Sequence, residues 1–403
     1  MTSAISPATD TRYLRHTQID GFSQPSIAAL NVIVVGAGAI GNEVIKNLAL
    51  LGVATAGGSL TVFDLDRVER HNLTRSVLLR ETDIGRDKAH AVVAHAQVLE
   101  PACHLIAVNG DIAETLSLQQ VADADIVIGC IDNFEARIRI NQLCLIAGTP
   151  WINTAIDSRY ASVDIFPFAQ TQPLPCYECT LPASVYDRIA ERRSCGGLLK
   201  VAQSQQVMPT TTITTSVAGA LAANQALVLT GCDTRLPGGR SGSSFRLFAD
   251  LLTGITTRSD LARADLCAGC DAFEWHAGVA HQAVSATELR AFIQDDQPHT
   301  HDVMLSDALI AAAACTNCGP RQHTDSLIGR RAASVPDSVI VCAECGEASV
   351  AIDIQDQFEL PTLVDLMGTK PLPGAWARLD HQFVSLGIQQ QVPARTSTPS
   401  ENS

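Results

Sequence analysis

The chain is short of positive charge. It carries 28 Lys and Arg residues against 42 Asp and Glu, a formal net charge of -14 at pH 7, and no stretch is rich in Lys and Arg. Such an acidic surface repels the phosphates of nucleic acids and of anionic lipids. We therefore expect neither nucleic acid nor a membrane as a partner.

Long hydrophobic runs are also missing. No stretch approaches the roughly 20 apolar residues of a membrane-spanning helix, and the N-terminal sequence MTSAISPATDTRYLR lacks the apolar segment of a secretory signal. These features predict a cytoplasmic protein. Disulfides are rare in that compartment, so clusters among the 13 cysteines are expected to be metal ligands or catalytic thiols.

Apolar runs alternate with helix-compatible segments over the first 150 residues. The strand-like runs are NVIVV (31–35), SLTVF (59–63), HLIAV (104–108) and DIVIGC (125–130). This alternation predicts an α/β fold with a doubly wound, mostly parallel, Rossmann-like sheet. With 403 residues, the chain is too long for one compact core and suits two or three domains.

A glycine-rich turn, GAGAIG, follows the first of these strands and opens a helical pattern. Gly36 permits a tight turn, Gly38 lets the backbone approach a phosphate, and Gly41 allows close packing of the helix. Asp64 lies at the end of the second strand, where a carboxylate accepts hydrogen bonds from ribose hydroxyls. On its own the turn indicates only a nucleotide, for which a dehydrogenase is the commoner interpretation, and a glycine turn without a ligand is the alternative.

Further charged and polar residues follow the ends of neighbouring strands. Asn72, Arg75 and Lys88 come after the second strand, and cations at a phosphate-binding turn suit a triphosphate. Asp132 follows the apolar run IVIGC, where a carboxylate can hold Mg²⁺ through water and phosphates. Simpler interpretations remain open: Asp132 or Asn133 caps the next helix, and the cations are solvated.

Taken together, these segments resemble the family of ubiquitin-activating enzymes and their bacterial relatives, the adenylyltransferases of molybdopterin and thiamine biosynthesis. The resemblance covers residues 10–275 and rests on four segments, GAGAIG, DLDRVERHNLTR, GRDK and CIDNFEAR. It implies an enzyme that uses ATP to adenylate the C-terminal glycine carboxylate of a ubiquitin-like or sulfur-carrier protein.

The resemblance also implies roles for single residues. Asp64 would bind the ribose, with Asp66 of the same segment in the nucleotide site. Asn72 and Lys88 would contact phosphates, and Arg75 would stabilise the charged transition state. Asp132 would engage Mg²⁺.

Two positions depart from the family pattern. Ser76 stands where the family usually has glutamine, and His16 replaces the glutamine of an N-terminal RYxRQ element. In relatives the second arginine of that element, here Arg15, reaches into the partner subunit's site. Arg15 therefore predicts a homodimer, while the alternative is a merely solubilising arginine.

Eight cysteines form four CxxC pairs: CYEC (176–179), CAGC (267–270), CTNC (315–318) and CAEC (342–345). Two such pairs supply four thiolates for one tetrahedral Zn²⁺, so the chain is expected to hold two structural zinc ions. None of the pairs opens a helix of a thioredoxin-like unit, which disfavours a redox role. The spacing leaves the pairing open, and the resemblance supports joining CYEC with CAGC.

Cys195 differs from the other cysteines. It lies in ERRSCGGLLK, where two arginines favour the thiolate and two glycines keep it accessible. In family members that conjugate ubiquitin-like proteins, a cysteine in this crossover segment takes the acyl group as a thioester. Cys195 is accordingly the candidate for thioester formation and transfer to a conjugating enzyme, against the alternative of an ordinary surface cysteine.

The expected organisation has four parts. They are an N-terminal arm (1–30), an ATP-binding adenylation domain with a crossover at about 181–209 (31–279), a zinc-ribbon-containing module (280–387) and a disordered tail (388–403). A ribbon this small cannot bury a large core, so zinc is expected to organise the module. Its partner is left open between a conjugating enzyme, the ubiquitin-like substrate and a scaffold role.

Four functions compete at this point. Adenylation with conjugation through Cys195 is the first, and adenylation followed by sulfur transfer in cofactor synthesis is the second. An NAD-dependent oxidoreductase and a catalytically silent zinc adaptor are the others.

Overall fold

The computed structural model describes ten stretches of the chain: 11–168, 174–187, 209–235, 242–272, 283–284, 302–335, 341–367, 372, 374–379 and 382–386. The chain divides into two compact units. The first comprises residues 1–281 with 381–383, and the second comprises residues 282–380 and 384–403. Each is described by itself below.

The first unit is built on an eight-stranded sheet in the order β3-β2-β1-β4-β5-β6-β7-β8. Strands β3 to β5 of this order run parallel, and β6, β7 and β8 are added antiparallel. The strands are β1 (Asn31–Val35), β2 (Ser59–Asp64), β3 (Leu105–Asn109), β4 (Ile126–Gly129), β5 (Trp151–Ile156), β6 (Tyr160–Phe166), β7 (Phe245–Asp250) and β8 (Ile255–Asp260). The parallel, doubly wound part confirms the predicted fold class.

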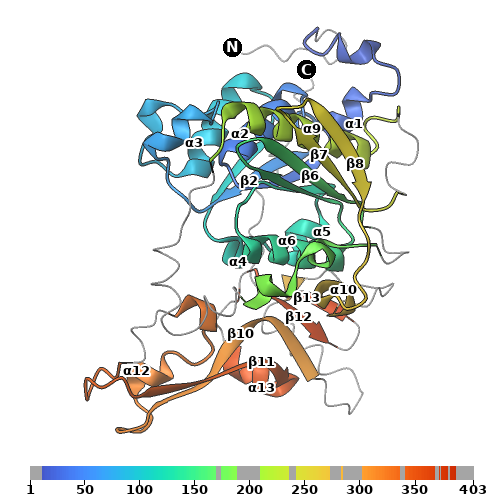
Figure 1. Ribbon diagram of the computed structural model, residues 1–403. Helices are drawn as coiled ribbons and strands as arrows, with labels where there is room; N and C mark the ends of the chain where they lie inside the picture. The colour runs from blue at the N-terminus through green and yellow to red at the C-terminus, as the bar shows by residue number, and fades with distance from the viewer. Residues whose placement is uncertain are drawn as a thin grey trace, which may run out of the picture. The chain divides into compact units, whose positions relative to one another are not determined.

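Helices cover both faces of this sheet (Figure 1). On one face, α2 and α9 pack on each other and α3 packs on α2, while α4, α5 and α6 lie together on the other. The helices are α1 (Gln24–Ala28), α2 (Ala39–Leu50), α3 (Lys88–Leu99), α4 (Ile112–Thr115), α5 (Leu118–Ala122), α6 (Phe134–Ala147), α9 (Thr212–Leu229) and α10 (Ala268–Ala272), with 3-10 turns η1 (His16–Gln18), η2 (Arg70–Thr74), η3 (Glu81–Asp83) and η4 (Tyr177–Thr180).

Strand β1 shows why the central strands form. Four of its five residues are buried, which is typical of a parallel strand covered by helices on both faces. Val32 and Val34 join the core beneath α2, where Val44 and Leu48 are fully buried. Because the strand order reverses between β1 and β4, a ligand is expected to bind at the carboxyl ends of these two strands.

The segment before β1 is more structured than an arm. Residues Gln24–Ala28 form α1, which begins at a Ser23 cap and buries Ile27 in the main core. The Ser23 amide also donates to the carbonyl of Cys232, 2.9 Å away, at the end of α9. Only Ile27 and Ala28 of this helix are buried, too few to reveal it in an otherwise polar stretch.

Helix α9 is long and apolar enough, by length and composition, to cross a membrane, although the sequence showed no run near 20 residues. Half of this 18-residue apolar stretch is buried inside the structure. It packs against α2, β5 and β6, as a helix in a protein core does. It is the one such helix among the residues the structure describes.

The second unit holds a five-stranded sheet in the order β11-β10-β12-β13-β9. Its elements are β9 (Ala283–Val284), β10 (Asp302–Cys315), β11 (Val350–Glu359), β12 (Trp376–Leu379), β13 (Gln382–Leu386), α12 (Gln322–Asp325), η5 (Ala332–Ser334) and α13 (Leu360–Met367). One hydrophobic cluster, which includes Leu363 and Val364 of α13, contains no cysteine. The unit therefore has an apolar core in addition to its cysteines, which differs from a module organised by zinc alone.

Candidate nucleotide and metal sites

The glycine turn between β1 and α2 is shaped by close backbone contacts. Gly36 has φ 96°, a left-handed conformation that favours glycine, and a Cβ there would collide with the carbonyl oxygen of Cys130. A Cβ on Gly41 would collide with the carbonyl oxygen of Gly36. At Gly38, by contrast, a Cβ would meet no atom of the described residues within 4 Å. The turn is closed on the protein side and open at Gly38.

Asp64 ties the end of β2 to this turn. One carboxylate oxygen accepts from the Ala37 amide (2.7 Å) and the other from the Asp66 amide (2.8 Å). Burial raises the pKa of Asp64, while the Lys88 ammonium and these two amides act to lower it. Asp64 is therefore held in place beside the turn.

Lys88 lies over the same strand end. Its buried ammonium nitrogen is 2.8 Å from Asp66 Oδ2 and 3.9 Å from Asp64 Oδ1. Two carboxylates thus hold a cation beside the glycine turn, at the first residue of α3. A phosphate approaching the turn would meet a preorganised positive charge.

Asp132 lies on the loop that follows β4, the strand that pairs with β1. It is exposed, and the loop reaches the turn because the Gly36 Cβ position lies against Cys130 and Ile131. The next residue, Asn133, caps α6 by accepting from the Ala136 amide at 2.7 Å. The capping role considered for either residue belongs to Asn133, and Asp132 keeps a carboxylate open to solvent.

Asn72 and Arg75 lie on the η2 segment between β2 and α3. The Asn72 oxygen accepts from the Glu69 amide at 2.9 Å, and Arg75 Nη1 donates to the His71 carbonyl at 2.7 Å. These contacts stay within the segment. Among the described residues, these contacts do not join Asn72 or Arg75 to the glycine turn.

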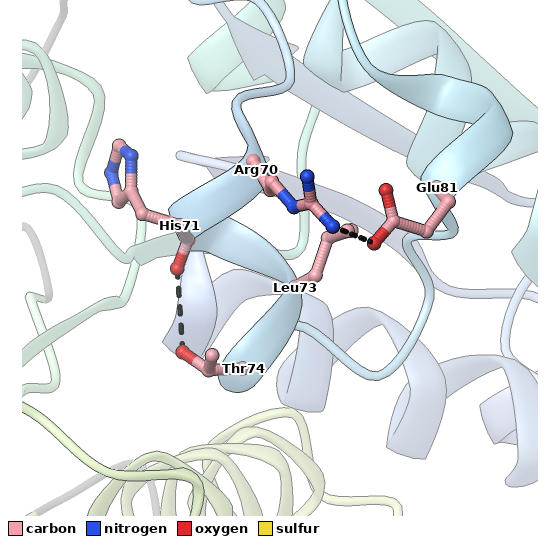
Figure 2. A pocket seen from close by; sticks show the side chains of 5 residues that line it. All are labelled: Arg70, His71, Leu73, Thr74 and Glu81. Atoms are coloured by element: carbon pink, nitrogen blue, oxygen red, sulfur yellow. Dashed lines mark hydrogen bonds and ion pairs between the residues drawn. The ribbon is translucent and has the colours of Figure 1, made fainter.

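An open cavity of about 570 Å³ also lies on η2. Figure 2 shows Arg70 and Glu81 facing each other across it, with an ion pair of 3.4 Å, and Thr74 turned to the His71 carbonyl. None of the predicted nucleotide residues belongs to its described lining. Because its charged groups already pair with each other, we place the nucleotide site at the glycine turn.

Two residues that contact the turn or the Asp132 loop were not found from the sequence. Asn42, fully buried in α2, hydrogen-bonds to the turn and to the η2 side of the fold. Arg137 of α6 donates to the carbonyls of Ile131 and Thr154, which fixes the loop carrying Asp132. The only sequence signal was a polar residue within an apolar helical face.

Cys130, although close to the turn, is no candidate nucleophile. Burial raises the pKa of its thiol to about 12, which leaves it protonated and weakly nucleophilic near neutral pH. Cys103 and Cys144 are likewise buried, as expected for core residues.

The first cysteine cluster joins residues that are distant in sequence. Cys176 Sγ lies 3.9 Å from Cys179 Sγ and 3.6 Å from Cys267 Sγ, and Cys179 Sγ lies 3.5 Å from Cys270 Sγ. The Cys270 amide points at Cys267 Sγ (3.4 Å), an arrangement that supports a thiolate. Four sulfurs within 4.8 Å of one another fit a tetrahedral zinc ion. This is the pairing that the resemblance supported.

The second cluster lies in the second unit, at the end of β10 and before β11. Its four sulfur atoms also lie within 4.8 Å of one another, and they belong to Cys315, Cys318, Cys342 and Cys345. Ser349 Oγ is 3.0 Å from Cys315 Sγ. This donor set fits zinc as well, but Cys345 is exposed, whereas three of the four cysteines in the first cluster are buried.

Two predicted residues remain apart from these sites. Cys195 lies outside the described residues. Arg15 is exposed and precedes η1, and no ion pair joins it to another described residue. The neighbouring Arg12 and Tyr13 dock this segment by contacting Glu100 at the end of α3.

The strand order, the glycine turn and the acidic end of β2 define a Rossmann-like nucleotide-binding domain, here bearing a zinc-type cysteine cluster. The chain belongs to the ThiF family, whose model matches residues 12–267, more than half of its length.

Two curated proteins that are similar to this chain are named as activating or adenylating enzymes. The SAMP-activating enzyme E1 of Haloferax volcanii is 32% identical over 186 residues, which is 45% of this chain and 66% of that protein. The sulfur carrier protein adenylyltransferase of Thermus thermophilus is 31% identical over 167 residues, 41% of this chain and 60% of that protein. The chain thus spans about two thirds or less of these curated relatives.

Among solved structures, E. coli MccB with ATP aligns at 22% identity and a TM-score of 0.48, over 61% of this chain and 68% of that one.

Proposed function

We propose that this protein uses ATP to adenylate the C-terminal glycine carboxylate of a ubiquitin-like or sulfur-carrier protein. The observation that carries the proposal is the presence of three groups at the carboxyl ends of β1, β2 and β4: the open face of the glycine turn, the Asp64–Lys88 pair and the exposed Asp132. Membership of the ThiF family and the printed names of its relatives support it.

The protein needs to perform little covalent chemistry in this reaction. A carboxylate oxygen of the carrier attacks the α-phosphorus of ATP, the bond to pyrophosphate breaks, and an acyl-adenylate and pyrophosphate form. Positioning and charge neutralisation supply most of such catalysis. In this proposal Asp64 binds the ribose, Lys88 and Asn72 hold phosphates, and Arg75 stabilises charge that develops at the α-phosphate.

Asp132 is the residue that would hold Mg²⁺. Its exposed carboxylate is a hard oxygen donor at the carboxyl end of a parallel strand, a donor type that suits this ion. When bound, the ion would neutralise phosphate charge. Arg137 would keep the Asp132 loop in place by holding the Ile131 carbonyl.

The test is isotope exchange between pyrophosphate and ATP in the presence of carrier proteins that end in a free glycine. Exchange is expected only with such a carrier, and blocking the terminal carboxylate as an amide should abolish it. Asp132→Ala and Arg75→Ala should each reduce exchange by at least about 100-fold. Both side chains are partly or fully exposed, so unfolding temperatures should change little.

Two results would contradict the proposal. Tight binding of a nicotinamide dinucleotide, with no exchange for any carrier, would favour the oxidoreductase. Near-normal exchange in Asp132→Ala would remove Asp132 from the site.

The fate of the acyl group is a finer proposal. We infer that Cys195 receives it as a thioester for transfer to a conjugating enzyme; the alternative is sulfur transfer, which the name of the Thermus relative favours. A carrier adduct that reducing agents release, and that Cys195→Ser lacks, would support the thioester. Normal adducts in Cys195→Ser would favour the alternative.

A second copy of the chain is also part of the proposal. Arg15 is exposed at the edge of the unit, where it is free to reach a partner subunit's site. If it does, mixing Arg15→Ala with Asp132→Ala protein should restore part of the exchange activity through mixed dimers.

A further inference from the structure

Asn42 is a buried polar side chain that none of the roles above includes. It lies in the first turn of α2 with no exposed surface, where an amide survives only if its hydrogen bonds are made. Its Nδ2 donates to the carbonyls of Ala37 (2.7 Å) and Gly38 (3.0 Å). Its Oδ1 accepts from the backbone amide of Leu78, 2.9 Å away.

The first pair of contacts lies on two carbonyls of the turn, and the Gly38 carbonyl also accepts from the Asn42 backbone amide (2.8 Å). In a trans peptide the N–H points away from the carbonyl of the same unit. Because the Ala37 and Gly38 carbonyls face Asn42, the amides of Gly38 and Ala39 point away from the buried side. The Ala37 amide is already taken by Asp64. The two outward amides lie where Gly38 is open, at the positive end of α2, which favours an anion.

The third contact reaches the other half of the site. Leu78 is buried and lies three residues after Arg75, so its amide anchors the end of the segment that carries Asn72 and Arg75. One side chain thus contacts both the anion-binding turn and the end of the segment that carries Arg75. The contacts within η2 found above do not make this link.

We propose that Asn42 is a positioning residue that aligns the phosphate-binding amides with the Arg75 segment for nucleotide binding and adenylyl transfer. The adenylyl-transfer part rests on the proposed function, whereas the nucleotide-binding part can be measured without it. Asn42 acts through its neighbours and does not touch the reacting atoms.

Two substitutions separate the contacts. Asn42→Asp keeps an oxygen for the Leu78 amide but loses both donors and places a carboxylate against two carbonyls. Asn42→Leu keeps the branching at Cγ, with two larger methyl groups, and loses all three hydrogen bonds. Glu43→Gln is the control, because Glu43 is equally buried on the same helix but contacts Lys46 and Ser216 instead of the turn.

The experiment measures ATP affinity of the full chain, hydrogen exchange of the Leu78 amide, and KM values in pyrophosphate exchange. ATP affinity should fall at least about tenfold in both Asn42 variants and less than about threefold in Glu43→Gln. Leu78 should lose protection in Asn42→Leu only. KM for ATP should rise while KM for the carrier stays nearly constant, a split that general destabilisation does not produce.

Unchanged ATP affinity in Asn42→Asp and Asn42→Leu would overturn this inference. Should wild-type protein bind ATP but exchange no pyrophosphate with any carrier, the proposed function would fail. The inference about nucleotide binding would still be decided by the three ATP affinities.

Discussion

At the scale of single residues, the glycines of the turn differ in what a side chain would meet. Gly41 leaves no room for a Cβ beside the Gly36 carbonyl, whereas the Gly38 position is open. A glycine-to-alanine substitution should therefore affect stability differently at these two positions, which lie three residues apart.

Gly41→Ala should lower the free energy of unfolding by about 2 kcal/mol or more, because α2 must move away from the turn. Gly38→Ala should change stability by less than about 1 kcal/mol, since its φ of -71° suits alanine. Its methyl group would instead occupy the space that phosphates need, so ATP affinity should fall. Denaturant unfolding and ATP titration of both variants measure this. Equal stability losses would contradict the assigned geometry.

Functional residues that belong to a local sequence motif could be predicted from the sequence. The glycine spacing indicated the turn, and the CxxC pairs indicated two clusters whose sulfur atoms the structure brings together. Asn42 and Arg137 were not predictable, because their roles depend on carbonyls supplied by other segments. Cys195 and Arg15 remain predictions.

At the scale of elements, the strands that alternate with helices were predicted to within a residue or two, as β1, β2, β3 and β4 show. Strand β8 was missed because all six of its residues are exposed, which leaves no apolar alternation to recognise. Strands β5 and β6 were not predicted, because apolar and polar residues are mixed in this stretch of sequence. Long-range pairing, rather than local pattern, defines these strands.

Asp83 joins η3 to α3 by contacting Arg80, Arg86 and His95. Burial would raise the pKa of Asp83, but the Arg80 amide, His95 and Arg86 outweigh it and lower the pKa below its usual range. His95 Nε2 and Arg86 Nη1 lie 2.8 and 2.7 Å from its two oxygens.

A carboxylate whose pKa is lowered by folding stabilises the native state above its unfolded pKa, about 4, and loses that contribution as the pH falls through the folded pKa. Asp83→Asn should therefore be less stable than wild type at pH 7, by about 2 kcal/mol. The difference should shrink as the pH falls from about 5 to about 2. The exposed Asp20→Asn is the control. A difference that is constant with pH, measured by chemical unfolding, would contradict this assignment.

The two cysteine clusters should release zinc at different rates. Cys345 of the second cluster is exposed, whereas three of the four cysteines of the first cluster are buried. A chelator should remove zinc in a fast and a slow phase, and the slow phase should accompany the larger loss of stability, because the first cluster closes a long loop.

An indicator dye follows the release, and melting curves follow stability. Cys345→Ser should remove the fast phase, and Cys176→Ser the slow one. Melting curves that do not respond to the chelator would show that the clusters are not structural zinc sites.

At the scale of the whole molecule, the chain combines a ThiF-family unit with a second unit that has its own sheet, apolar core and cysteine cluster. The family match ends at residue 267, so the relatives say nothing of the second unit's role. Its role stays open between docking a conjugating enzyme, docking the ubiquitin-like substrate and serving as scaffold.

The central claim is that ATP gives its adenylyl group to a carrier protein's terminal carboxylate. The most direct measurement compares ATP labelled at the α-phosphate with ATP labelled at the γ-phosphate, each incubated with the protein and a glycine-ended carrier. The account predicts that α-label alone reaches the carrier, and that Asp132→Ala abolishes the transfer. Transfer of γ-label, or of no label from any such carrier while nicotinamide dinucleotide binds, would contradict it.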